Sequence, residues 1–141
     1  MADRNVRIVK NAGRPVSRKL KKTASQAFDK NSLVEFASGL INPADDNDTL
    51  VYGIITEEVA TSDEDYATTA AKDVDLIKPG DLVEIAYTGS APTVGVSYGI
   101  SNAYTVDTGD TTNDVFTVET VNSAAGTCRG YFKAITGGNT V

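Results

Sequence analysis

Apolar and polar residues alternate along much of the chain after residue 30. Val83, Ile85 and Tyr87 fall on one face of an extended segment, and the same alternation recurs over residues 94–101. This period of two predicts half-buried β-strands, because successive side chains on a strand point to opposite faces. Shorter runs rich in β-branched and other apolar residues predict further strands at residues 33–36, 50–55, 74–77, 115–121 and 128–135.

Turn residues separate these predicted strands at short intervals. Pro79-Gly80 fits the two central positions of a type II turn, and Ser38-Gly39 marks another turn. A short helix is expected within residues 62–71, with Ser62 as its N-cap, acidic residues in its first turn and an alanine-rich run after them. The chain is therefore expected to be all-β, a small β-barrel or sandwich with one short helical insertion.

Charge is distributed unevenly along the 141 residues. Residues 1–30 carry nine Lys and Arg against two acidic residues, a net charge of +7, whereas residues 31–141 carry four against seventeen, a net charge of −13. The first 22 residues show no sustained strand or helix period and contain Gly13 and Pro15. We therefore expect residues 1–30 to form an extended basic N-terminal arm, ordered on a partner, and residues 31–141 to form the β-barrel body.

The basic side chains of this arm are the candidate binding site. They would contact an acidic protein surface, contact nucleic-acid phosphates, or stay solvated without a partner. Nucleic-acid sites usually add exposed aromatic side chains, yet the first aromatic residue is Phe28, and the acidic body would repel a duplex. We expect a protein partner ahead of a nucleic acid, bound through Arg4, Arg7, Lys10, Arg14, Arg18, Lys19, Lys21 and Lys22.

The composition argues against an enzyme, because the chain has no His and a single Cys. Ser-His-Asp and Cys-His catalysis cannot be built from one copy of such a chain, and neither can an internal disulfide or a CxxC zinc site. Cys128 is expected to pack in the core. No run approaches the roughly 18 apolar residues of a membrane helix. We expect no cofactor, no metal ion and no membrane contact.

Two motifs allow more specific chemistry. Val106-Asp107-Thr108-Gly109 contains the Asp-Thr-Gly of aspartic proteases, but Asp110 and the lack of a later hydrophobic-Gly-Arg segment favour a simple turn. Asp45-Asp46-Asn47-Asp48 fails the spacing of an EF-hand, whose sixth and twelfth positions would here be Leu50 and Thr56. A divalent-cation site without EF-hand spacing is the alternative at such acidic loops. The preferred interpretation is that these side chains are solvated charges.

The order of strands and turns in the body is similar to that of a known family. The matching segments are Leu33-Val34-Glu35-Phe36, Ser38-Gly39-Leu40-Ile41, Leu50-Val51-Tyr52-Gly53-Ile54-Ile55, Lys78-Pro79-Gly80-Asp81-Leu82-Val83-Glu84-Ile85, Val94-Gly95-Val96-Ser97-Tyr98 and Gly126-Thr127-Cys128-Arg129-Gly130-Tyr131-Phe132. Over about residues 28–135 this pattern resembles the small β-barrel head-decoration, or cement, proteins of tailed bacteriophages. In those proteins a Gly turn ends an early segment, a Gly-Ile strand follows, and a Val-Gly-x-x-Tyr strand precedes the final hairpin.

The resemblance implies a structural role on a virion. Such proteins lie on the outer surface of the capsid, often as homotrimers, and stabilise it by bridging subunits of the major capsid protein. By this resemblance the chain would be made in the host cytoplasm and would bind the major capsid protein, and its charge distribution assigns that contact to the basic arm. The alternative function is a nucleic-acid-binding small β-barrel that uses the same arm.

Overall fold

The computed structural model describes residues 4–46 and 51–133. Within these ranges the chain forms eleven strands in two sheets and no helix. The prediction of an all-β fold is therefore confirmed.

The first sheet has six strands and closes on itself. They are β1 (Arg7–Lys10), β7 (Leu82–Thr88), β8 (Ser97–Asn102), β9 (Thr105–Asp107), β10 (Phe116–Asn122) and β11 (Thr127–Phe132). They pair in the order β1-β7-β11-β10-β8-β9, and β9 also pairs in parallel with the end of β7. This pairing closes β7 to β11 into a small ring of strands, and β1 is added to the start of β7.

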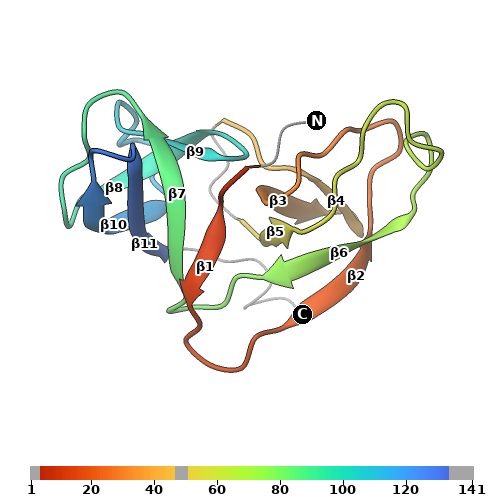
Figure 1. Cartoon of the computed structure of the whole chain (residues 1–141), viewed down its shortest axis with the longest axis horizontal. Helices are drawn as coiled ribbons and strands as arrows, with labels where there is room; N and C mark the ends of the chain where they lie inside the picture. Colours follow the sequence, from red (N-terminus) through yellow and green to blue (C-terminus); the bar gives the residue numbers. More distant parts are fainter. Residues whose placement is uncertain (1–3, 47–50, 134–141) are drawn as a thin grey trace.

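The second sheet has five strands and an open edge. They are β2 (Ser17–Lys21), β3 (Ser32–Ala37), β4 (Leu40–Pro43), β5 (Gly53–Ile55) and β6 (Ala71–Leu76), paired in the order β2-β6-β5-β3-β4. The two edge strands come together at an isolated parallel bridge between Lys22 and Ile41. Figure 1 shows β7–β11 on one side of the molecule and β2–β6 on the other, with β1 between them.

Two buried cores hold these sheets together, and β3 and β5 lie between the cores. On β3, Leu33 packs in the core of the first sheet, whereas its neighbour Val34 packs in the core of the second. On β5, Ile54 and Ile55 divide in the same way. A strand buried on both faces needs a continuous apolar run, which explains why these two segments do not alternate in the sequence.

Most predicted strands are confirmed with shifted bounds. Residue 50 of the predicted strand 50–55 and residues 134 and 135 of the predicted strand 128–135 lie outside the described residues. The strand predicted over residues 94–101 begins only at Ser97, because Val94 and Gly95 form a turn, with a φ of 88° at Gly95. The Ser38-Gly39 turn is confirmed, since both residues have the positive φ that a two-residue hairpin turn requires.

The short helix expected within residues 62–71 is wrong: residues 61–69 form consecutive turns. The N–H groups of Asp63, Tyr66 and Thr68 each bond to the carbonyl three residues earlier, not four. A helix would also need the Tyr66 carbonyl to accept from residue 70, but that carbonyl accepts from the Ser25 N–H and from the Lys22 ammonium. Hydrogen bonds to residues far away in the sequence thus replace the hydrogen bonds of a helix in this segment.

The structure does not show the extended N-terminal arm for residues 4–30. β1 pairs with β7, and all five residues of β2 pair with β6. Val6 is buried in the first core and Phe28 in the second. Edge strands need few apolar residues, because only part of one face is covered, so a Lys- and Arg-rich segment gave no visible strand period.

Candidate functional site: the basic residues of β1 and β2

The eight predicted site residues follow the chain from just before β1 to just after β2. Arg4 precedes β1, and the others lie in β1, in the connection to β2, in β2 and directly after it, in the order Arg7, Lys10, Arg14, Arg18, Lys19, Lys21 and Lys22. The structure divides the eight into residues engaged within the chain and residues that are exposed and unpaired.

Arg4 and Lys19 form ion pairs with acidic residues of the chain. The Arg4 Nε donates to Asp29 Oδ2 at 2.9 Å, and the Arg4 guanidinium lies 3.5 Å from the centroid of the Tyr104 ring. The Lys19 Nζ lies 2.9 Å from Asp73 Oδ1 on the neighbouring strand β6. Lys19 nevertheless keeps a side chain that is 68% exposed, so it can still contact a partner, whereas Arg4 is fastened at two points.

Glu84 of β7 holds Arg7 of β1 and Arg129 of β11 against the first sheet. Its two carboxylate oxygens accept from the Arg7 Nε at 3.1 Å and from the Arg129 Nε at 3.0 Å. Burial by itself would raise the pKa of Glu84, but the hydrogen bonds and the positive charges of the two guanidinium groups together outweigh it and hold this pKa below its ordinary value of 4.5. Arg7 therefore fastens β1 to β7 of the first sheet.

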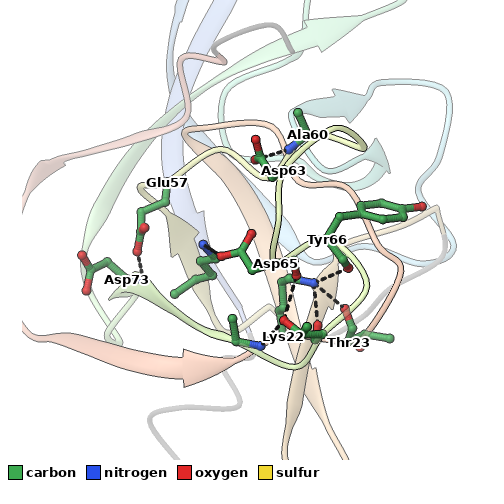
Figure 2. A network of polar contacts seen from close by, with 11 residues as sticks. Lys22, Thr23, Glu57, Ala60, Asp63, Asp65, Tyr66 and Asp73 are labelled. Carbon is green, nitrogen blue, oxygen red and sulfur yellow. Dashed lines mark hydrogen bonds and ion pairs between the residues drawn. The ribbon is translucent and has the colours of Figure 1, made fainter.

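Lys22 is fully buried, and main-chain carbonyls hold its ammonium group (Figure 2). The Nζ donates to the carbonyl oxygens of Tyr66 and Thr68 at 2.7 Å each and to that of Thr23 at 3.3 Å. Three acceptors match the three N–H donors of an ammonium group. Burial lowers the pKa of Lys22, and the negative charge of Asp65 partly offsets this effect. Lys22 is a structural residue and is removed from the predicted site.

The remaining four residues are exposed. Among the described residues, none of the acidic groups lies within ion-pair distance of Lys10, Arg14, Arg18 or Lys21. We call these four the open basic residues. They occupy one continuous stretch of chain that leaves the first sheet and enters the second (Figure 1). They are the part of the predicted site that is available to a partner.

Asp81 positions this stretch of chain, and the sequence analysis did not identify it. Its side chain is fully buried, and its Oδ1 accepts from the Ala12 N–H at 2.7 Å. Its Oδ2 accepts from the Lys78 N–H at 2.8 Å and from the Lys78 Nζ at 2.9 Å, and the same Nζ donates to Asn11 Oδ1. An Asp directly after a Pro-Gly turn is a common turn residue, so the sequence carried no signal for a contact 69 residues away.

The other motifs form local structure. Asp107 Oδ1 accepts from the Gly109 N–H at 2.8 Å, and the Thr108 hydroxyl donates to the carbonyls of Thr88 and Ser90, so the turn interpretation of Asp-Thr-Gly is confirmed. In the described ranges, no group of three or more His, Cys, Asp or Glu side chains is arranged to hold a metal ion. Residues 47 and 48 of the acidic loop lie outside those ranges.

Cys128 is expected to resist thiol reagents in the folded protein. It is buried on β11, and burial, with a smaller contribution from the charge of Glu84, raises its pKa to about 11 from an ordinary value of 9.0. This shift alone leaves about 100-fold less thiolate at neutral pH. Reaction with a disulfide reagent at about pH 8 should be far slower in the native chain than in guanidinium chloride. A Ser123→Cys variant, with an exposed thiol in the β10–β11 turn, should react at once; equal rates at both thiols would contradict the burial.

No protein-family model matches this chain, and no curated protein matches it either. Across the part of the chain that the structure describes, no helix is long and apolar enough to span a membrane.

Proposed function

We propose that this protein is a structural protein of a phage virion. It decorates the outer surface of the capsid and stabilises it by bridging subunits of the major capsid protein. The observation that carries the proposal is the set of open basic residues, which are exposed and form no ion pair with the described acidic residues, although residues 31–141 carry a net charge of −13. The all-β fold and the resemblance to phage decoration proteins agree with this role.

In this proposal the partner binds a preformed surface, not a flexible arm that becomes ordered on binding. Because β1 and β2 are paired and Asp81 fastens their connection, the open basic residues are presented by preformed structure. Less conformational entropy is then lost on binding. Many identical copies on a shell need only modest contacts each, and complementary charge favours encounter with an acidic surface. The homotrimer implied by the resemblance belongs to the same proposal.

Reversing charge on β2 is expected to weaken capsid binding. The variant Arg18→Glu with Lys21→Glu should cosediment at least about tenfold less well with shells assembled from the major capsid protein of the same phage. Adding salt should weaken the unaltered chain in the same direction. Deleting residues 1–22 is not a suitable test, because it removes two strands and the buried Lys22.

The control is Lys30→Glu, which makes the same reversal of charge at one other exposed residue of the first 30, and therefore half the change in net charge of the double variant. It should leave cosedimentation nearly unchanged. Equal binding of the β2 double variant and the unaltered chain would remove Arg18 and Lys21 from the contact. A salt-dependent shift of duplex DNA without binding to shells would instead favour the nucleic-acid alternative.

A further inference from the structure

We propose that the open edge of β2 binds an extended, acidic segment of a partner protein as an additional strand of the second sheet. The inference rests on the proposed function for the identity of the partner, and it specifies how that partner is bound. The geometry of β2, its missing neighbour and its charge each contribute to the argument.

The direction of the main-chain groups of β2 follows from its pairing with β6. Just before β2, the Leu76 N–H donates to the Val16 carbonyl at 2.9 Å, and just after it, the Lys22 N–H donates to the Ala70 carbonyl at 3.1 Å. Even-numbered residues therefore bond toward β6. The register between the two strands is continuous, without a bulge.

Alternation along an antiparallel pair then places the odd-numbered groups on the opposite side. The N–H and C=O groups of Ser17, Lys19 and Lys21 point away from β6. The next odd residue, Thr23, shows which strand lies on that side of β2. Its N–H donates to the Ile41 carbonyl of β4 at 3.0 Å. The parallel bridge between Lys22 and Ile41 also engages the Lys21 carbonyl, so β4 covers this edge of β2 from that carbonyl onward. Nearer the start of β2, β4 has ended in its turn to β3, and β2 has no neighbour on this side among the described strands.

Within the described ranges, no strand pairs with Ser17, with Lys19 or with the Lys21 N–H on that side. All three are exposed, so a strand can approach them. An incoming antiparallel strand would meet the N–H donors of Ser17, Lys19 and Lys21 and the carbonyl acceptors of Ser17 and Lys19, at the spacing of a sheet ladder. Addition of a strand to such an edge is a recurring mode of peptide recognition, in which the main chain supplies affinity and the side chains supply specificity.

The side chains select an acidic occupant. Arg18, Lys19 and Lys21 flank the open edge, and Arg14 lies just before it. A second copy of β2 would place like charges opposite one another, which is unfavourable in a strand pair. Lysines on an edge strand discourage pairing with apolar strands. An acidic strand would instead be attracted by them, which makes the edge selective for acidic segments.

The first test uses a synthetic acidic peptide, acetyl-Thr-Glu-Val-Asp-Val-Glu-Thr-amide, and the full-length chain. Amide hydrogen exchange, followed by NMR, should slow by at least about tenfold at Ser17, Lys19 and Lys21 when the peptide is saturating. Arg18 and Leu20 should change little, because their N–H groups are already bonded to β6. A peptide with Lys in place of each Glu and Asp should not bind.

Two variants then isolate the main-chain contribution. Lys19→Gln removes the charge and keeps the N–H, whereas Lys19→Pro removes both, at a position whose N–H does not serve the β6 ladder. The Pro variant should bind the acidic peptide roughly 3- to 10-fold more weakly than the Gln variant. If the Pro variant does not fold, the exchange pattern of the unaltered chain still tests the proposal.

Three results would overturn strand addition: no binding of the acidic peptide, binding without slower exchange at the odd-numbered amides, or equal binding of the Lys-substituted peptide. The last two would mean that the lysines attract charge or only protect the edge from aggregation. If capsid cosedimentation persists in any of these cases, the proposed function stands and only the mode of binding fails. If the peptide adds as a strand but shells do not bind, the proposed function fails instead.

Discussion

Replacing Lys22 with methionine is expected to lower the free energy of unfolding by about 2–4 kcal/mol. Methionine fits the space of the lysine stem but donates no hydrogen bond, so the carbonyls of Thr23 and Thr68 lose their Nζ donor. Relief of the cost of burying a charge offsets part of this loss. Chemical denaturation, with the midpoint and slope fitted together, measures the change.

The matched control is Lys21→Met, the same substitution at the exposed neighbour. It should change stability by no more than about 0.5 kcal/mol. Equal effects of the two substitutions would contradict a structural role for the ammonium group of Lys22. Hydrogen exchange should also quicken across residues 66–70 in the Lys22 variant, because that ammonium group fastens this segment to the end of β2.

The stability of the unaltered chain and that of the Lys22→Met variant should also depend differently on pH. The pKa of Lys22 is lower in the folded state than its ordinary value of 10.5, so the unfolded state binds the proton more tightly. Stability from this group therefore rises as the pH increases from the folded pKa to 10.5. The difference in stability between the unaltered chain and Lys22→Met should widen over that range, and a narrowing would contradict the lowered pKa.

Replacing Asp81 with asparagine is expected to destabilise the protein by about 3–5 kcal/mol. The buried carboxylate accepts hydrogen bonds at both oxygens, from Ala12 on one and from Lys78 on the other. An amide of the same shape directs its NH₂ group at one of these donors and leaves the Lys78 ammonium without its carboxylate. Denaturation measures the loss, and faster exchange of the Ala12 amide reports release of the β1–β2 connection.

A matched control is Asp114→Asn, which breaks a more exposed ion pair with Lys133 and should cost no more than about 1 kcal/mol. Lys78→Met removes the ion pair with Asp81 but keeps the two hydrogen bonds that Asp81 accepts from main-chain N–H groups. It should therefore lower the free energy of unfolding by less than Asp81→Asn does. If Asp81→Asn proves as mild as the Asp114 variant, Asp81 does not anchor the connection. Capsid binding by Asp81→Asn should also weaken, because the open basic residues lose their fixed placement.

The strands with a local signal were predictable because each was marked by its own residues. β7 alternates the buried Val83 and Ile85 with less buried neighbours. Pro79-Gly80 forms the expected turn, with a φ of 87° at Gly80 and a hydrogen bond from the Asp81 N–H to the Lys78 carbonyl. Side-chain period and turn chemistry are properties of a few consecutive residues, so a single sequence displays them.

The candidate site was likewise predictable only where the residues themselves carried the signal. The sequence identified the basic residues near the N-terminus, but it did not show that Lys22 is buried or that Arg4 and Arg7 are engaged by Asp29 and Glu84. Lys22 is followed by Thr23 and preceded by Lys21, and nothing in that run distinguishes a buried lysine from an exposed one. Its two nearer acceptors, the carbonyls of Tyr66 and Thr68, come from residues more than 40 positions later in the chain.

The sequence by itself determined an all-β chain with a basic beginning and an acidic remainder, because strand period, turn residues and charge are local or additive properties. Only the tertiary structure decided that the basic beginning is two paired strands, that β3 and β5 are buried between two cores, and that the four open basic residues form no ion pair with a described acidic residue. Each of these outcomes depends on partners far away in the chain, and a partner supplied by folding leaves no mark on the residues that receive it.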